Sequence, residues 1–224
     1  MEDNIAFKKW DNGEKNLIIT FAGNGWHVNW DGKLPIFEFG RSLSNMELPC
    51  DISFLRDTTN SWYLGGLEGI GENIDHTISF LKNETQNYDK VICIGASSGG
   101  YGSLLFGSLI NAYASLAFIP QTDLQWIFDI QCPSNRPKWK PLCNASKLEA
   151  FDKYSNLNAI INSTTQYFIH SYTAEHDVLH GPHHYENISE FPNVNRLDQR
   201  VTTMIKNGGL EAMLKSLLDN GDGS

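Results

Sequence analysis

The sequence lacks the features that place a chain in a membrane or on nucleic acid. It has no apolar run of the roughly 18 residues that a membrane-spanning helix needs, and its start, MEDNIAFKKW, has no basic segment followed by an apolar block. No Lys/Arg cluster is longer than a pair, and the formal net charge of -9 disfavours binding to phosphate backbones or anionic membrane surfaces. We therefore expect a cytoplasmic protein with no nucleic-acid partner and no membrane partner.

Cysteine is scarce and shows no metal-binding spacing. The four cysteines, Cys50, Cys93, Cys132 and Cys143, form no C-x-x-C pair. Cysteines of cytosolic proteins are normally reduced. We expect four free thiols.

Cofactor motifs are also missing. No G-x-G-x-x-G opens the first β-α unit, and no Lys-Ser/Thr follows a G-x-x-x-x-G, so nucleotide binding is not expected. Histidines and acids gather between Glu175 and His184, but no H-E-x-x-H occurs. The adjacent His183 and His184 would point in different directions on a helix or strand. We expect a solvated polar loop here, with no metal and no cofactor.

Short apolar runs alternate with stretches of helical period, which predicts an α/β fold in one domain over residues 1–224. The expected sheet is mostly parallel and six- or seven-stranded, with helices on both faces. The Asn12-Gly13 pair is a strong hairpin signal and predicts that the first two strands pair with each other. The expected strands are residues 5–10, 16–23, 51–57, 90–95, 115–120, 165–172 and a short 193–197.

Helices are expected where apolar residues recur every three or four positions. One such face consists of Ile70, Ile74, Ile78 and Leu81. A terminal helix is expected over residues 201–217, with an interruption at Gly208-Gly209.

The segment 129–146 carries three prolines, few aliphatic residues and an exposed-looking Trp139. It predicts a long irregular excursion, which is either a lid over an active site or a plain surface loop.

The sequence around Ser97 fits a catalytic serine. Residues 95–99, GASSG, match G-x-S-x-G, and they follow an apolar strand and precede a helical run. The small neighbours allow a sharp strand-to-helix turn that lifts the hydroxyl above the sheet. The glycines after it suit a helix that approaches the sheet closely and turns its N-terminus towards developing negative charge. We therefore predict that Ser97 is the nucleophile. The alternative is that these residues form a Gly-rich turn with no catalytic role.

The oxyanion of an ester reaction needs two donors. In an α/β-hydrolase they are the amide after the nucleophile, here Ser98, and one from the loop after an earlier strand. That loop supplies Gly23 or Asn24, although these residues would also form a simple turn. His27 lies in the same loop and is a further candidate to line the site.

The acid and base of a hydrolase follow the serine in chain order. Asp177 follows the strand 165–172 and is the preferred acid, with Glu175 as the alternative. The last histidine of the chain is His184, so His180 and His184 are the nearest candidates for the base. His170 falls within a strand and is expected to be an interior residue.

Several blocks of the chain resemble bacterial α/β-hydrolase-fold proteins, some of them associated with enzymes of polysaccharide or glycan biosynthesis. The blocks are residues 17–23, 54–74, 91–109, 116–122 and 205–214. The run from Arg56 to Tyr63, RDTTNSWY, is more discriminating than G-x-S-x-G. By this resemblance Ser97 is the nucleophile and Asp57 lines or braces the site, with Trp62 beside it.

In that group a Gly-His pair opens the final helix and supplies the base. This sequence has Asp198-Gln199 there, and a glutamine cannot accept and return a proton near neutral pH. Either another histidine has taken the role, or the chain has kept the fold and lost the reaction.

Two functions follow. The first is a serine hydrolase or acyltransferase acting on a small-molecule or glycan ester through an acyl-enzyme at Ser97. The second is an inactive hydrolase-fold protein that binds a glycan or a protein partner in the old pocket. Gln199 favours this second function, because it stands where the base is expected. Aromatic residues expected in loops also favour it, because they can stack on sugars, namely Trp26, Trp30, Trp62, Tyr63 and Trp139.

Overall fold

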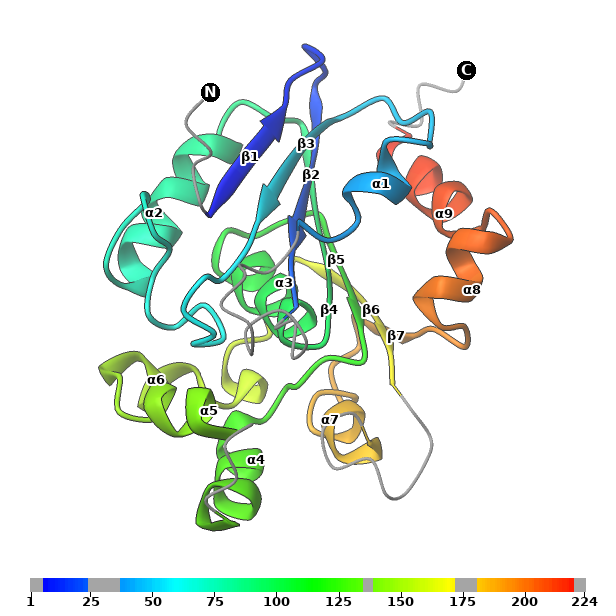
Figure 1. Cartoon of the computed structure of the whole chain (residues 1–224). Coiled ribbons are helices and arrows are strands. Elements are labelled where there is room, and N and C mark those ends of the chain that lie inside the picture. Colours follow the sequence, from blue (N-terminus) through cyan, green and yellow to red (C-terminus); the bar gives the residue numbers. More distant parts are fainter. Residues whose placement is uncertain (1–5, 24–36, 135–138, 172–180, 220–224) are drawn as a thin grey trace.

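A computed structural model describes residues 6–23, 37–134, 139–171 and 181–219 (Figure 1). Its seven-stranded sheet has the order β1-β3-β2-β4-β5-β6-β7, and every neighbouring pair except β1–β3 is parallel. The predicted α/β class, mostly parallel sheet and strand positions are confirmed. The strands are β1 (Phe7–Trp10), β2 (Asn16–Phe21), β3 (Asp51–Leu55), β4 (Lys90–Ala96), β5 (Ala114–Phe118), β6 (Gln166–His170) and β7 (Val194–Arg196).

The predicted hairpin between β1 and β2 is wrong. β3 lies between them, and β1 pairs antiparallel with β3, with Phe7 opposite Leu55. Gly13 does form a turn at φ 74°, but the amides of Asn12 and Glu14 donate to the Asp51 carboxylate at the start of β3. The turn therefore delivers β1 to the far side of β3, where an edge strand with partly exposed residues fits better than a central one.

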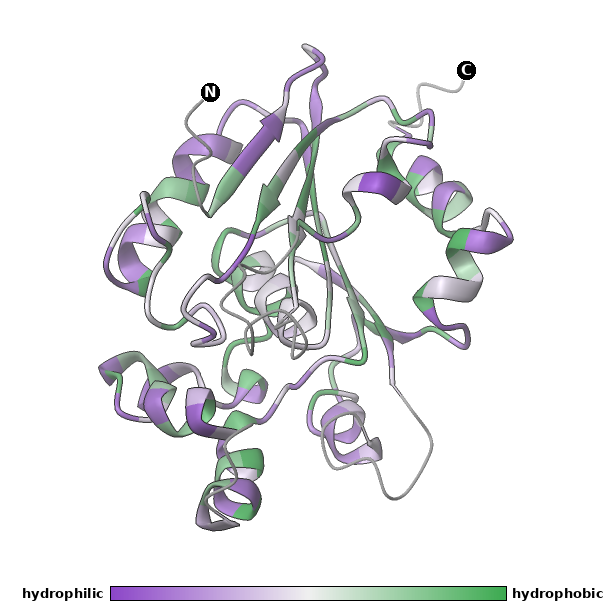
Figure 2. Ribbon diagram, viewed as in Figure 1, coloured by the Kyte–Doolittle hydropathy of each residue, from purple (hydrophilic) through white to green (hydrophobic). Residues whose placement is uncertain are grey.

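Helices cover both faces of the sheet, as predicted (Figure 1). Alternate residues of the buried strands point to opposite faces: Leu17 and Ile19 pack with α2 and α3, whereas Ile18 packs with α8 and α9. Green and purple residues adjoin along α9, as an amphipathic cover requires (Figure 2). The helices are α1 (Gly40–Leu43), α2 (Ile74–Thr85), α3 (Ser98–Leu109), α4 (Leu124–Gln131), α5 (Lys140–Ala145), α6 (Glu149–Tyr154), α7 (Pro182–Glu186), α8 (Val201–Lys206) and α9 (Gly209–Leu218), with 3-10 turns η1 (Cys132–Ser134) and η3 (Leu157–Ala159).

The excursion 129–146 is mostly helical where the structure describes it, which corrects the expectation of an irregular loop. It contains the end of α4, η1 and α5, and Pro141 lies in the first turn of α5, where a missing amide proton costs no hydrogen bond. Trp139 is buried and not exposed, since it packs into the main core. Helices α4 to α7 gather at the carboxyl ends of the parallel strands (Figure 1).

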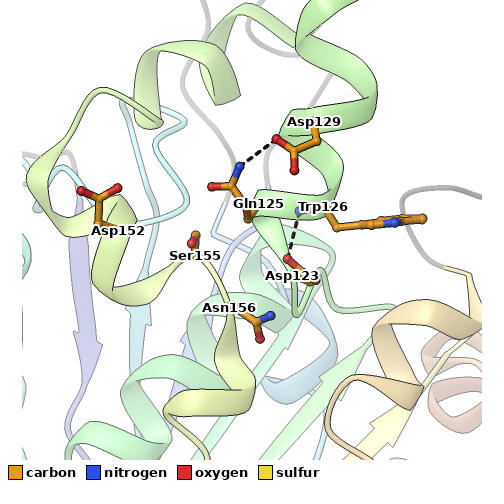
Figure 3. Close-up of a pocket in the computed structure, with 7 residues that line it drawn as sticks. All are labelled: Asp123, Gln125, Trp126, Asp129, Asp152, Ser155 and Asn156. Atoms are coloured by element: carbon orange, nitrogen blue, oxygen red, sulfur yellow. Dashed lines mark hydrogen bonds between the residues drawn. The ribbon is translucent and has the colours of Figure 1, made fainter.

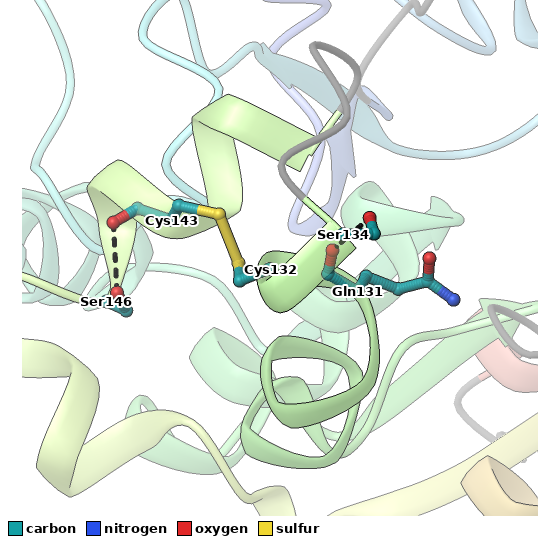
Figure 4. The surroundings of a disulfide bond; sticks show 5 residues. All are labelled: Gln131, Cys132, Ser134, Cys143 and Ser146. Carbon is teal, nitrogen blue, oxygen red and sulfur yellow. Dashed lines mark hydrogen bonds between the residues drawn. A yellow bond between two sulfur atoms is a disulfide. The ribbon is translucent and has the colours of Figure 1, made fainter.

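Two of the four cysteines form a disulfide, which corrects the expectation of four free thiols. Cys132 at the end of α4 is bonded to Cys143 in α5, with a Cα–Cα distance of 5.9 Å (Figure 4). Cys50 and Cys93 are free and buried. Disulfides are rare in reducing compartments, so this bond and the predicted cytoplasmic location point in different directions.

The C-terminal helix is interrupted where the glycine pair predicts it. Gly208, at φ 75°, separates α8 from α9. Within the described ranges, no helix combines the length and the apolar character that crossing a bilayer requires.

Candidate functional site

Ser97 occupies a sharp turn between the end of β4 and the start of α3. Its backbone has φ 56° and ψ -123°, a conformation that L-residues rarely adopt. Its amide donates to the carbonyl of Phe118 at 2.9 Å, and its carbonyl accepts from the amide of Tyr101 at 3.0 Å. The strand, turn and helix are therefore arranged as the G-x-S-x-G pattern predicts.

The glycines around Ser97 are required by close packing. A Cβ on Gly99 would overlap the carbonyl oxygen of Phe21, and a Cβ on Gly95 would overlap that of Gly99. These positions let α3 start directly against the ends of β2 and β4. Ser98, the first residue of α3, is buried there.

A partly buried glutamate lies at the predicted oxyanion donor. The Gly23 amide donates to Oε2 of Glu38 at 2.9 Å, and a Cβ on Gly23 would be 2.8 Å from the Ala96 carbonyl oxygen. Burial raises the pKa of Glu38, and the hydrogen bond from Gly23 opposes the shift. Gly23 is thus next to the serine turn, and its amide already donates a hydrogen bond to the Glu38 side chain. The other predicted residues of this loop, Asn24 and His27, lie outside the described residues.

Asp57 is a buried brace. Its carboxylate accepts from the amides of Thr59 and Tyr63 at 2.9 Å each, and from the hydroxyls of Thr59 and Ser61 at 2.8 and 3.3 Å. Burial raises its pKa, and these donors oppose the shift. The carboxylate therefore orders the loop 57–63.

The aromatic pair after Asp57 joins this loop to two strand ends. Trp62 and Tyr63 are buried with φ 55° and 66°. The Trp62 indole donates to Oε1 of Gln121 at 2.5 Å, beyond β5, and the Tyr63 hydroxyl donates to the Ala22 carbonyl at 2.7 Å, beyond β2. Both side chains pack in the core, so they offer no stacking surface for a sugar.

Of the two predicted base residues, the structure describes only His184. His184 is buried in α7, where its carbonyl accepts from the Thr122 hydroxyl at 2.6 Å and its ring lies edge-on to Trp126. Among the described residues, no hydrogen bond joins the Ser97 hydroxyl to an imidazole. Asp177 and His180 lie outside the described residues.

Gln199 is exposed, and its carbonyl oxygen accepts from Asn207 at 3.0 Å. This hydrogen bond lies at the surface and joins the residues on either side of α8. His170 is an interior residue of β6, as predicted, and its Nδ1 lies 3.0 Å from the Leu197 carbonyl oxygen.

An acid and a histidine that the sequence reasoning missed do pair. Nε2 of His183 lies 3.1 Å from Oδ2 of Asp123, and the His183 ring stacks on Trp126 with centroids 4.1 Å apart. Oδ1 of Asp123 also accepts from the Trp126 amide at the start of α4. The order Ser97, Asp123, His183 is the order of hydrolase triads. One signal was available: Asp123 directly follows the block 116–122, which ends in the residues FIPQT.

A polar cleft of about 460 Å³ opens between α4 and α6, near this pair (Figure 3). The described residues hold no cluster of three or more His, Cys, Asp or Glu side chains with the geometry of a metal site. The cleft is lined by Asp123, Gln125, Trp126, Asp129, Asp152, Ser155 and Asn156.

No protein-family model and no curated protein sequence matches this chain. Solved structures do match it in fold. The capsule O-acetyltransferase of Neisseria meningitidis serogroup A is 14% identical with a TM-score of 0.59, covering 95% of this chain and 91% of that one. Esterase B from Lactobacillus rhamnosis is 13% identical with a TM-score of 0.58, covering 92% of this chain and 78% of that one.

MGS-M2, an alpha/beta hydrolase enzyme from a Medee basin deep-sea metagenome library, is also similar. It is 12% identical with a TM-score of 0.50, covering 97% of this chain and 94% of that one. At such identities the likeness concerns the fold. With its parallel sheet and its serine turn after β4, the chain has the α/β-hydrolase fold.

Proposed function

We propose that this protein is a serine hydrolase or acyltransferase that acts on an ester through an acyl-enzyme at Ser97. The observation that carries the proposal is the strained backbone of Ser97 between β4 and α3. Backbone strain of this kind persists where the surrounding structure enforces it and is typical of functional sites. The fold neighbours include an esterase and a capsule O-acetyltransferase, which supports ester chemistry and a small-molecule or glycan ester as the substrate.

In the proposed reaction the Ser97 oxygen attacks the acyl carbon while a base takes the hydroxyl proton. The ester C–O bond then breaks, and the alcohol leaves with a proton returned by the base. Water or an acceptor hydroxyl attacks the acyl-enzyme in the same way and frees Ser97. The two outcomes are hydrolysis and acyl transfer.

The oxyanion is assigned to the amides of Ser98 and of Gly23 or Asn24. Ser98 opens a helix of 12 residues, whose N-terminus favours negative charge. Gly23 donates to Glu38, so the substrate oxygen has to replace the Glu38 carboxylate at that amide. Burial disfavours the charged form of Glu38 and raises its pKa, which lowers the cost of that exchange.

We propose that His180 or His184 is the base and that Asp177 is the acid that orients it, as the chain order suggests. The Asp123–His183 pair is a third arrangement of an acid and an imidazole, and it already has the required hydrogen bond. Substitution of each histidine by glutamine separates these assignments. The variant that lacks the catalytic base should lose turnover at every pH, although Ser97 itself is still present.

The alternative is an inactive hydrolase-fold protein that binds a glycan or a protein. It is favoured by Gln199, which stands where the resemblance expects the base and engages Asn207 at the surface.

A fluorophosphonate probe tests the choice. We expect it to label the wild type and Ser44→Ala, an exposed serine, and to leave Ser97→Ala unlabelled. Turnover of 4-nitrophenyl acetate should disappear with the same substitution. Equal labelling of wild type and Ser97→Ala, or labelling of neither, contradicts the enzyme and supports the alternative.

A further inference from the structure

The cleft between α4 and α6 has the size and the lining of a ligand site. Its volume of about 460 Å³ lies within the range of small-molecule pockets. One wall comes from the first turns of α4 and the other from the end of α6 and the residues after it (Figure 3). The lining contains three carboxylates, two carboxamides and one hydroxyl, but no lysine or arginine.

The hydroxyl of Ser155 distinguishes this cleft from a chance cluster of acids. Ser155 is 7% exposed, and its hydroxyl has no hydrogen-bond partner among the described residues. Its carbonyl accepts from the Leu124 amide at 2.7 Å, which fixes the residue against the start of α4. Figure 3 shows the side chain between Asp152 and Gln125. A hydroxyl that lines the cleft and bonds to no other side chain is available to a ligand, either as a donor or as an acceptor.

The charges of the lining select the class of ligand. Asp129 and Asp152 are exposed carboxylates, and no positive side chain lines the cleft, so phosphates, sulfates and carboxylates are repelled. Nε2 of Gln125 donates to Oδ1 of Asp129 at 2.8 Å, which orients both groups. The remaining oxygen atoms of these side chains are acceptors. They fit a ligand with several hydroxyl donors, since hydrogen bonds to carboxylates are the stronger ones.

The cleft is held rigid at both ends of α4. Asp123 caps the start of the helix and pairs with His183, and the disulfide from Cys132 fixes the end of the helix to α5. A preformed site binds with a smaller loss of conformational freedom than a site that must order on binding.

The cleft is also close to the serine turn. The Phe118 carbonyl accepts from the Ser97 amide, and Asp123 follows Phe118 by five residues. Five residues span at most about 18 Å when fully extended. A ligand of a few linked sugar units is long enough to bridge a distance of this size.

We propose that this cleft binds uncharged sugar units through their hydroxyl groups, and that it holds the glycan part of the ester substrate. Sugar binding stands on the cleft alone. Its use as the substrate subsite rests on the function proposed for Ser97.

Saturation-transfer NMR on the Ser97→Ala protein tests the binding without turnover. The probes are maltotriose and chitotriose, with glucuronate as the anionic comparison. We expect transfer to at least one trisaccharide and none to glucuronate. We also expect Gln125→Ala and Ser155→Ala to weaken binding at least five-fold, whereas Gln131→Ala, farther along α4 and outside the cleft lining, should leave it unchanged.

Each other outcome overturns the inference. These outcomes are no transfer to either trisaccharide, binding of glucuronate as tight as that of the sugars, or equal binding by Gln125→Ala, Ser155→Ala and Gln131→Ala proteins with matched melting temperatures. Probe labelling of Ser97 is measured separately on the wild type. Sugar binding without labelling contradicts only the hydrolase function, and labelling without sugar binding contradicts only this cleft.

Discussion

At the scale of single residues, the site depends on backbone positions that most side chains cannot occupy. Ser97 is held at φ 56° by hydrogen bonds to Phe118 and Tyr101. Gly99 leaves no room for a Cβ beside Phe21. The surrounding sheet and helix thus hold the serine in a conformation that costs free energy.

The strain at Ser97 predicts an unusual order of stability. The free energy of unfolding of Ser97→Gly should be about 1 kcal/mol higher than that of Ser97→Ala, because glycine adopts positive φ without a Cβ clash. Chemical denaturation of the two variants measures the difference. At Ser103, inside α3, the same pair should show the opposite order, since alanine is the better helix former. Equal stability of the two Ser97 variants would show that the turn is unstrained.

Glu38 predicts a pH dependence of stability. Its raised pKa means that the folded state keeps the proton to higher pH than the unfolded chain does, whose pKa is near 4.5. The stabilisation is full below that value and falls as pH rises through the folded pKa. Glu38→Gln cannot ionise, so it should lose less stability than the wild type between about pH 5 and about pH 7.

Denaturation at both pH values measures this. Asp57 shifts in the same direction, but it is present in both proteins and cancels in the comparison. Glu190→Gln, an exposed position, should keep the wild-type dependence. A Glu38→Gln protein with the same pH dependence as wild type would show that Glu38 titrates as an exposed glutamate does.

At the scale of elements, α4 and α5 form a covalently closed corner over the carboxyl ends of the strands. Trp139 is buried beneath it, and the Cys132–Cys143 bond closes a sequence separation of 11 residues (Figure 4). This mostly helical segment has few aliphatic residues and thus gains order from a crosslink and one large aromatic side chain.

Removal of the disulfide predicts a loss of stability. The double variant Cys132→Ser/Cys143→Ser should unfold with a free energy about 2–3 kcal/mol lower than wild type, since the crosslink restricts the unfolded chain. A reductant should lower the stability of the wild type and leave the variant unchanged. Wild-type stability that does not respond to reductant contradicts the prediction.

Thiol counts give an independent check of the pairing. Unfolded without reductant, the chain should show two thiols, Cys50 and Cys93. With reductant it should show four. In the folded protein, burial raises the pKa of Cys50 to about 12, so alkylation of that thiol should be slow.

At the scale of the whole molecule, the last helix fixes the first parallel strand. The side chain of Asn16 donates to the Leu218 carbonyl at 3.4 Å, and Lys90 donates to that of Leu217 at 2.9 Å. The buried leucines of α9 complete the core on the face opposite α3. The C-terminal helix and the sheet therefore share one hydrophobic core.

Truncation of that core predicts a global loss of stability. Leu214→Ala should cost about 2–5 kcal/mol, because it leaves a cavity against β2 and β4. Ser216→Ala, on the exposed side of α9, should stay within about 0.5 kcal/mol of wild type. Urea denaturation of both variants measures the contrast. A Leu214→Ala loss as small as that of Ser216→Ala would mean that α9 packs loosely on the sheet.

Local patterns predicted much of this architecture. The apolar runs, the glycine break in the last helix and the G-A-S-S-G turn each depend on neighbouring residues, and the structure has the expected elements at these places. The pairing of β1 with β3 was not predictable in this way. The Asn12-Gly13 turn is real, but contacts to Asp51, nearly forty residues away, decide which strand β1 joins.

By itself, the sequence determined the positions of the strands, the helices α2, α3 and α8–α9, and the serine at the turn, because hydrophobic period and glycine placement act over a few residues. Only the tertiary structure decided that Cys132 meets Cys143, that Trp139 and Trp62 are buried, that Glu38 reaches Gly23 and that Asp123 pairs with His183. Those contacts join residues from separate elements. Their partners are set by how the helices pack at the carboxyl ends of the strands, which no local pattern records.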